Sequence, residues 1–427
     1  MRVGVQTWGT EGDIRPFLAL GKALVGRGHT VRMVYTSIEA RDFGPLAAAC
    51  GVQATSVGAD YFESHREHLA QRARTAFLDP SPIRQVRSIL EDLMDPVAAR
   101  MVEAGQALAR GSDVFISHFL AYPGHVAAER ERVPHVMVGL VPMFASSHCA
   151  PIGMPSLGRV FHRVEWWVAN RVFESIFAPR MNPLRQRVGL PLLKSVLDPN
   201  LVRSRLALVA VSPSLFPTPP DWNARASVVG AMMLPEDTQP WKPDAALRQF
   251  LDAGPAPAFL SFGSMFNLDL ERTATVVRLL ADAVERAGLR GIIQAPEPVV
   301  RGAQARKCIH HLVRAPHVHL FPRCSVVVHH GGAGTTQSAL LAGRPSVVVP
   351  HAADQFFWGG LVHTRGAGCK PLLATRLTVD SLAARLRQTA KRPEFAVNAQ
   401  ALGRALAREN GAERAATLIE AAVKAHG

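Results

Sequence analysis

The chain has 427 residues, of which 48% are apolar and 19% are charged, a balance typical of folded globular proteins and unlike that of disordered chains. At roughly 100–200 residues per domain, this length predicts two domains. The formal net charge is +14, yet the basic residues are spread along the chain without a block of like charges, which disfavours a nucleic-acid binder and fits an enzyme whose substrates carry phosphate.

The amino terminus and the cysteines favour a cytoplasmic protein. The first ten residues, MRVGVQTWGT, run directly into a strand-like segment and lack the long apolar stretch of a signal peptide. No apolar run approaches the roughly 18 residues that a membrane-spanning helix needs. The five cysteines are scattered and never form a Cys-x-x-Cys pair, which argues against a disulfide framework and a structural zinc site.

The first 35 residues predict a βαβ unit. A strand over 2–5 leads into a turn over 9–13, a helix over 16–25 with Pro16 in its first turn, and a second strand over 30–35. Further buried strands are predicted at 114–117, 135–138 and 206–211. This order indicates an α/β fold with a parallel sheet.

A proline-rich stretch over 213–243 separates two halves, and we place a linker at 236–245 between a domain of residues 1–235 and a domain of residues 246–427. In the second half the strand–helix rhythm restarts, with a helix over 269–287 and an alanine-rich helical stretch over 379–425. The predicted strands of this half cover 258–262, 291–294, 325–329 and 346–349. Two α/β domains of similar size predict a cleft in which ligands bind at the carboxyl ends of the strands.

A glycine-rich turn follows the strand at 325–329, with the sequence His329-His330-Gly331-Gly332-Ala333-Gly334-Thr335-Thr336. Glycines let a backbone approach an anion closely, and the amino end of the following helix offers free N–H groups and the positive end of its dipole. His330 and Thr335 can add side-chain donors. The turn therefore predicts a cradle for a diphosphate; it is neither a Walker A loop nor a GxGxxG motif.

The strand after this helix ends at Pro350, and the residues that follow carry a carboxylate, Asp354, beside a carboxamide, Gln355. Such a pair suits a polyhydroxylated sugar, because the carboxylate accepts from hydroxyls and the carboxamide both donates and accepts. The structural alternative is that Asp354 only caps the helix that begins at Gln355.

Three segments together resemble the signatures of family 1 glycosyltransferases with the GT-B fold, in their bacterial and fungal sterol-glucosyltransferase-like branch. They are HHGGAGTT at 329–336, PHAADQFFW at 350–358 and GTEGDIRPFLALGKALVGRGH at 9–29. The segment APRMNPLRQRVGLP at 178–191 is similar to bacterial rhamnosyltransferases that act on hydroxy-fatty-acid lipids. The resemblance implies two Rossmann-like domains facing across a cleft, an N-terminal acceptor-binding domain, a C-terminal nucleotide-sugar domain, and a C-terminal helix that returns to the N-terminal domain.

The resemblance also implies roles for single residues. Asp13 matches the acidic residue that acts as the general base. The positions that match the donor-binding residues are Gly263, Ser264, His330, Gly332, Gly334, Thr335, Asp354 and Gln355.

These roles imply an inverting transfer of a hexose from a nucleotide diphosphate sugar to an acceptor hydroxyl. UDP-glucose is the expected donor, with a dTDP-deoxysugar as the open alternative. Asp13 takes the proton of the acceptor, while His330 and the helix amino end stabilise the leaving diphosphate, as a divalent metal does elsewhere. The sequence holds no compact Asp-x-Asp or His/Cys cluster, so we expect no metal and no cofactor beyond the nucleotide sugar. A purely helix-capping Asp13 is the alternative.

The acceptor is expected to be an apolar, hydroxylated small molecule or lipid of the sterol, polyketide or hydroxy-fatty-acid type. Candidate acceptor-binding residues are Met143, Phe144 and Trp166, although aromatic residues in this region equally suit a packed core. A basic, aromatic helix near 159–178 also fits a peripheral contact with the inner face of a membrane.

Three other functions compete with this prediction. A nucleotide-sugar epimerase or hydrolase shares the architecture but would consume its donor without an acceptor. A non-catalytic glycosyltransferase auxiliary protein need not retain Asp13, His330, Asp354 and Gln355, all of which are present. A nucleic-acid binder would need a concentrated basic face.

Overall fold

The computed structural model describes residues 1–78, 81–154, 156–195, 204–234, 241–263, 266, 269–352 and 354–425. The chain forms two compact units, unit 1 from Met1–Leu234 with Glu409–Gly427 and unit 2 from Pro235–Arg408. The expected segment 246–427 is therefore split, because its last residues pack with unit 1. Of the expected linker, residues 236–240 lie outside the described residues, and Ala245 already begins a helix.

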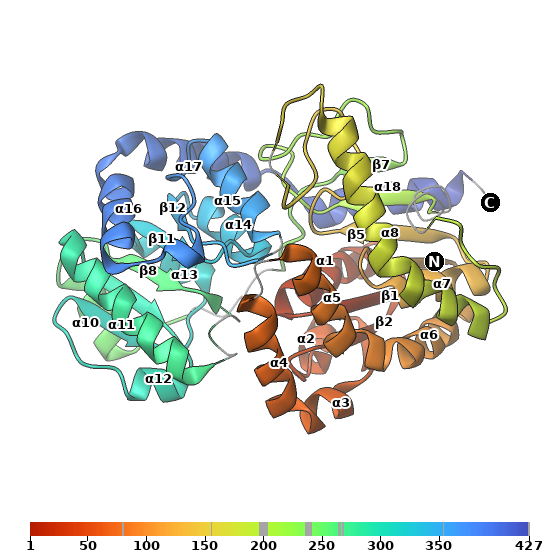
Figure 1. Ribbon diagram of the computed structural model, residues 1–427, viewed down its shortest axis with the longest axis horizontal. Helices are drawn as coiled ribbons and strands as arrows, with labels where there is room; N and C mark the ends of the chain where they lie inside the picture. Colours follow the sequence, from red (N-terminus) through yellow and green to blue (C-terminus); the bar gives the residue numbers. More distant parts are fainter. Residues whose placement is uncertain are drawn as a thin grey trace. The chain divides into compact units, whose positions relative to one another are not determined.

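Unit 1 is a parallel sheet covered by helices (Figure 1). Within the described residues its strand order is β3-β2-β1-β4-β5-β6-β7, and every pair is parallel. The elements are β1 (Arg2–Gly9), α1 (Glu11–Gly26), β2 (Thr30–Ser37), α2 (Gly44–Ala49), β3 (Gln53–Ser56), α3 (Ala59–Ser64), α4 (Arg66–Leu78), α5 (Pro82–Leu93), α6 (Asp95–Arg110), β4 (Val114–His118), α7 (Tyr122–Arg130), β5 (His135–Gly139), α8 (His162–Arg187), β6 (Leu206–Val209), β7 (Ala226–Val228) and α18 (Gly411–Lys424).

The start of the chain differs from its prediction. Helix α1 begins at Glu11, five residues before the expected start, so Pro16 lies inside the helix and not in its first turn. The cause is a capping box, in which Thr10 is the N-cap and Asp13 the third residue of the helix. Strand β1 is correspondingly longer and runs to Gly9.

The last helix, α18, packs against α1 in unit 1, which confirms the predicted return of the chain. Ala415, Ala416 and Ile419 are fully buried in the same hydrophobic core as Leu18 and Leu20. The contact is completed by a polar network, which is described next.

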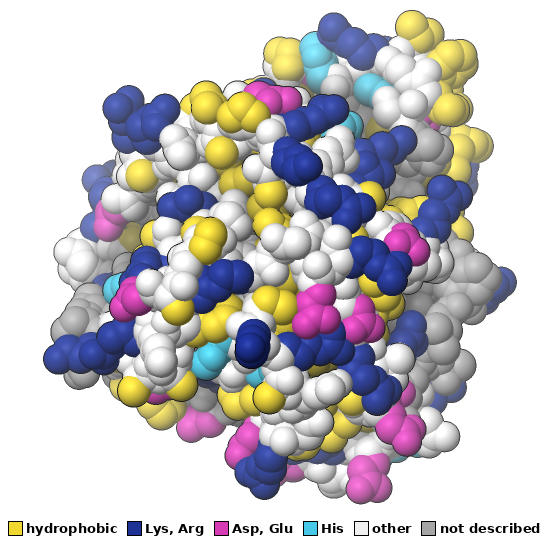
Figure 2. Space-filling model, turned by 90° about the vertical axis from the view of Figure 1, so that its left-hand side faces the viewer, with side chains coloured by type: hydrophobic (Ala, Val, Ile, Leu, Met, Phe, Trp, Pro, Cys, Tyr) yellow, Lys and Arg dark blue, Asp and Glu magenta, His cyan; other side chains and the backbone are white. Residues whose placement is uncertain are grey.

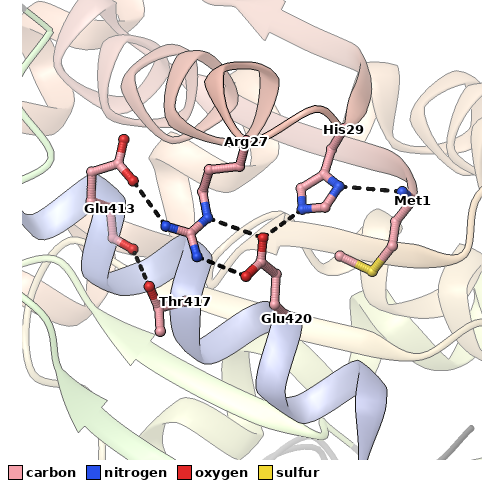
Figure 3. A network of polar contacts seen from close by, with 6 residues as sticks. All are labelled: Met1, Arg27, His29, Glu413, Thr417 and Glu420. Atoms are coloured by element: carbon pink, nitrogen blue, oxygen red, sulfur yellow. Dashed lines mark hydrogen bonds and ion pairs between the residues drawn. The ribbon is translucent and has the colours of Figure 1, made fainter.

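A polar network joins the end of α1 to α18 (Figure 3). The Arg27 guanidinium donates to both carboxylate oxygens of Glu420, at 3.0 and 2.7 Å, and to Glu413 at 3.3 Å. His29 Nε2 lies 2.7 Å from Glu420 Oε1, and its Nδ1 lies 3.2 Å from the amino group of Met1. These hydrogen bonds lower the pKa of Glu420 to about 2.

Unit 2 repeats the α/β arrangement with a smaller parallel sheet (Figure 1). Its strand order within the described residues is β10-β9-β8-β11-β12. The elements are α10 (Ala245–Asp252), β8 (Ala258–Ser261), α11 (Leu270–Ala287), β9 (Gly291–Gln294), α12 (Glu297–Arg301), β10 (Ile309–Leu312), α13 (His317–Leu320), η2 (Phe321–Arg323), β11 (Val326–His329), α14 (Ala333–Leu341), β12 (Ser346–Val348), α15 (Gln355–Thr364), η3 (Ala374–Arg376), α16 (Val379–Lys391) and α17 (Pro393–Leu406).

One face of the molecule carries mixed charge. On the face drawn in Figure 2, Lys and Arg side chains are scattered among Asp, Glu and apolar ones and do not gather in one patch. Among the described residues, no helix is long and apolar enough to cross a bilayer.

Candidate active site

Three loops meet at the carboxyl edge of the unit 2 sheet. Strand β11 lies between β8 and β12, and His329 is in register with Ser261 on one side and Val348 on the other. The residues that follow these three strands therefore share one edge, where parallel α/β sheets bind ligands. They carry Gly263, His330 and the segment 350–355.

The turn between β11 and α14 is tight because two glycines allow it. Gly331 has φ +98°, and a Cβ there would come within 2.8 Å of the carbonyl oxygen of Gln355. Gly332 is the N-cap of α14, and within the described residues no side chain caps this helix. Its first-turn amide groups are thus available to an anion, as the glycine-rich turn predicts.

His330 is enclosed by the two glycines that flank it in space. A Cβ at Gly263 would lie 2.9 Å from its Cε1 atom, and a Cβ at Gly332 would lie 2.5 Å from its Nε2 atom. Burial, and then the nearby imidazole of His351, lower the pKa of His330 to about 4, so the ring is neutral at pH 7. Its Nδ1 atom is buried and has no hydrogen-bond partner among the described residues. A neutral imidazole with such a nitrogen can donate to a phosphate oxygen.

The two neighbouring histidines hold the loops in place. His329 Nδ1 accepts from the amide of Gly331 at 3.1 Å, while His351 Nδ1 donates to the carbonyl oxygen of Val349 at 2.9 Å. The His351 ring meets Phe262 edge to face, with 5.0 Å between the ring centroids. Burial lowers the pKa of His329 to about 3 and that of His351 to about 4. The sequence prediction gave His351 no role, although it lies in the loop after β12, and His330 lies in the turn after β11.

The predicted sugar-binding pair lies at the start of α15. Gln355 Oε1 accepts from the amides of His351 at 2.7 Å and Ala352 at 3.2 Å, so this side chain shapes the loop. Asp354 is the N-cap residue of α15, and its Oδ2 accepts from the indole of Trp358 at 3.2 Å.

Three of the other four residues predicted to bind the sugar donor lie in this site. Gly263 has φ +57°, a conformation that favours glycine, while Ser264 lies outside the described residues. Gly334 and Thr335 lie in the first turn of α14, where a Cβ at Gly334 would meet nothing within 4 Å.

In unit 1, Asp13 caps helix α1. Its Oδ2 atom accepts from the amide of Thr10 at 2.8 Å and from the hydroxyl of Thr10 at 2.9 Å. Gly9, with φ +134°, lies against the carboxylate and has no room for a Cβ. Burial raises the pKa of Asp13, and the two Thr10 hydrogen bonds oppose that rise only partly. Both bonds reach Oδ2, whereas Oδ1 receives none from the described residues, so capping leaves one oxygen for other chemistry.

Charged neighbours of Asp13 went unrecognised in the sequence. Burial raises the pKa of Glu39, a backbone hydrogen bond from Glu11 and the charge of Arg41 oppose that rise, and the carboxylates of Glu11 and Asp13 add to it. Glu11 pairs with both Arg15 and Arg41. Glu39 and Arg41 are more than 20 residues from Asp13 in the sequence, so no local sequence pattern indicates that they lie near it.

The predicted acceptor residues lie in the loop after β5 and in α8. Phe144 is buried and meets Trp222 edge to face, with 5.3 Å between the ring centroids. Trp166 is buried and donates from Nε1 to the carbonyl oxygen of Cys149 at 2.8 Å. Met143 is partly exposed. Both aromatic rings thus contribute to packing, and an acceptor contact by these three residues stays a prediction.

The described residues contain no group of three or more His, Cys, Asp or Glu side chains placed to hold a metal ion.

Comparison with known proteins identifies the class. Residues 303–421 match the family model "Erythromycin biosynthesis protein CIII-like, C-terminal domain". The solved glycosyltransferase of kitacinnamycin has the same fold, with a TM-score of 0.69, 22% identity and coverage of 99% of this chain and 98% of that chain. The fold is therefore that of the GT-B glycosyltransferases.

Two curated relatives define the family more closely. The O-mycaminosyltylonolide 6-deoxyallosyltransferase of Streptomyces fradiae is 31% identical over 432 residues, which cover 98% of this chain and 97% of that protein. A sterol 3-beta-glucosyltransferase of Arabidopsis thaliana is 29% identical, over 96% of this chain and 66% of the relative. The chain belongs to this family of glycosyltransferases and is an enzyme of that class.

Proposed function

We propose that the chain transfers a sugar from a nucleotide diphosphate donor to a hydroxyl group of an apolar acceptor, with inversion at the anomeric carbon. The observation that carries this proposal is the uncapped amino end of α14 beside the neutral, enclosed imidazole of His330. Both features suit an oxyanion that gains charge as a bond breaks. We assign the donor diphosphate to this position.

On this proposal the protein neutralises the leaving group without a metal. As the bond between the anomeric carbon and the diphosphate oxygen breaks, negative charge grows on the diphosphate. The amides of the first turn of α14 and an N–H of His330 would stabilise this charge, and because both belong to a folded turn, little reorganisation would be needed during the reaction. Asp354 and Gln355 are assigned to the hydroxyl groups of the donor sugar.

Asp13 is proposed as the general base. Its raised pKa makes the carboxylate a stronger base, and Oδ1 is the oxygen that the Thr10 cap leaves available. The acceptor hydroxyl loses its proton to Oδ1 as its oxygen attacks the anomeric carbon, and the nucleotide diphosphate leaves. The capping bonds hold the carboxylate in one orientation, so the two roles support each other.

We propose UDP-glucose as the donor and a sterol, polyketide or hydroxy-fatty-acid lipid as the acceptor. The sterol 3-beta-glucosyltransferases among the relatives support a hexose and an apolar acceptor. A dTDP-deoxysugar is the second candidate, because the relative with 31% identity is a 6-deoxyallosyltransferase and the glycosyltransferase VinC, of this fold, is solved with dTDP.

Thermal-shift binding tests this proposal, with UDP, dTDP, GDP, UDP-glucose and dTDP-rhamnose as ligands and without added metal. A ligand at about 100 times its Kd stabilises the fold by about 2.7 kcal/mol, which raises the melting temperature measurably. The proposal predicts that the melting temperature rises with the ligands of one nucleobase only. It also predicts that the enzyme releases the corresponding nucleoside diphosphate only when an acceptor is present. Donor consumption without an acceptor would indicate a hydrolase or epimerase, and no shift with any ligand would favour an auxiliary protein.

A further inference from the structure

Unit 1 exposes an apolar stripe at the start of α8. Its residues and their exposed fractions are Leu157 (65%), Val160 (86%), Phe161 (54%), Val164 (58%), Trp167 (60%) and Val168 (38%). Their spacing of three and four residues places the helical members on one side of α8. A group of large exposed apolar side chains within so short a segment marks a contact surface.

The stripe is held in a fixed orientation by residues that point the other way. Trp166, next to the exposed Trp167, is buried and bonds to the carbonyl oxygen of Cys149. Glu165 Oε1 accepts from the amide of Leu157 at 2.7 Å, which ties the preceding turn to the helix. The exposed side chains therefore project from a structured base, and burying them costs little ordering entropy.

The exposed charged residues between 157 and 171 are all arginines. Arg159, Arg163 and Arg171 are exposed beside it, and the Arg171 guanidinium lies 5.5 Å from the centroid of the Trp167 ring. The only acidic residue between 157 and 171 is Glu165, whose side chain is buried. The segment 157–171 thus exposes apolar and aromatic side chains together with cations and no acidic side chain.

We propose that the apolar stripe binds to the surface of an anionic lipid membrane. Aromatic and aliphatic side chains enter the interface between head groups and acyl chains, while arginines pair with lipid phosphates. Charge complementarity favours this occupant over a second copy of the chain, since a symmetric contact would bring the same three arginines together from both copies.

The stripe also lies near the functional edge of unit 1. It is tied to the loop after β5 through Cys149 and through Ser147, whose carbonyl oxygen lies 3.0 Å from His162 Nδ1. This loop leaves the carboxyl edge of the sheet, the edge that also carries Asp13 after β1. If the proposed transfer function holds, a bound membrane would supply the apolar acceptor at this edge; membrane binding itself does not depend on that function.

Vesicle flotation of the full chain tests the proposal. The vesicles consist either of phosphatidylcholine alone or of an equal mixture of phosphatidylcholine and phosphatidylglycerol, in about 0.1 M and about 1 M salt. The test variant is Phe161→Ser with Trp167→Ser. The matched control is Val318→Ser with Val397→Ser, two positions of unit 2 that are 54% and 60% exposed. A third variant, Arg159→Glu with Arg163→Glu, tests the charge.

We expect the wild-type chain to float with the mixed vesicles and at least about tenfold less with phosphatidylcholine or in high salt. The stripe variant and the charge variant should each bind at least about tenfold more weakly, with unchanged melting temperatures, while the control binds as the wild type. Absence of wild-type flotation, or equal binding by the stripe variant and the control, would overturn the proposal. The proposal would also be overturned if light scattering showed a dimer of the wild-type chain and a monomer of the stripe variant, because the stripe would then join two copies of the chain.

Discussion

The substitution Gly332→Ala tests the placement of His330 most sharply. Gly332 has φ −64° and ψ 143°, which any residue adopts, so the alanine adds no backbone strain. Its Cβ, however, would lie 2.5 Å from His330 Nε2, about 1 Å inside ordinary contact distance. The backbone of Gly263 limits movement to the other side, because even a Cβ built on that residue would lie only 2.9 Å from the Cε1 atom of His330. The imidazole must therefore leave its position.

The loss of donor affinity in Gly332→Ala follows from the proposed hydrogen bond between His330 and the diphosphate, which the variant cannot form. A hydrogen bond to a charged group is worth about 1.5–3 kcal/mol, so the affinity for the donor diphosphate should fall roughly 10- to 150-fold. Isothermal titration of the variant with UDP and dTDP measures this change. The matched control is Gly360→Ala in α15, where a Cβ meets nothing within 4 Å. We expect unchanged affinity there and stabilisation by about 0.5–1 kcal/mol. Equal affinities of Gly332→Ala and the wild type would refute the assigned role of His330.

Two further predictions concern stability. The pKa values of His329, His330 and His351 lie near 3, 4 and 4, below their unfolded value of about 6.5, so the unfolded chain takes up protons first as the pH falls. The stability that these neutral histidines contribute is therefore complete above about pH 6.5 and is lost as the pH falls. The free energy of unfolding should decrease by about 2 kcal/mol or more between pH 7 and pH 5, and by less in the variant His330→Gln. Urea titrations that show no decrease would contradict this prediction. Glu420→Gln should lower the melting temperature by weakening the contacts of Arg27 and His29 in Figure 3, and Glu413→Gln, with one longer contact at a more exposed carboxylate, should lower it less. Thermal unfolding that ranks the two variants in reverse would disprove this assignment.

Much of the fold could be predicted from the sequence because its signals are local. Each predicted buried strand appears within a few residues of its expected place, since β-branched runs between turns leave few alternatives. The early start of α1 does not follow from Pro16, which suits a first turn; it follows from the capping box of Thr10 and Asp13. The division of the last helical stretch between the units depends on long-range packing, which no local pattern encodes.

The site was predicted in part for the same reason. The turn at 329–336 and the pair at 354–355 are contiguous motifs, so their proximity follows from neighbouring parallel strands. The enclosure of His330 by Gly263 and Gly332 depends on two separate loops, and only the folded chain brings them together. The proximity of Glu39 to Asp13 also depends on the folded chain, because Asp13 follows β1 and Glu39 follows β2.

The most direct test of the central claim is the substitution Asp13→Asn. The asparagine side-chain oxygen can still accept from Thr10, so the cap and the fold should persist, but the amide cannot take a proton from the acceptor. With the donor found by thermal shift, transfer measured by mass spectrometry should fall about 100- to 10,000-fold, while the donor affinity stays within about threefold. Transfer at a nearly wild-type rate would contradict the assignment of Asp13 as the base of a glycosyltransferase.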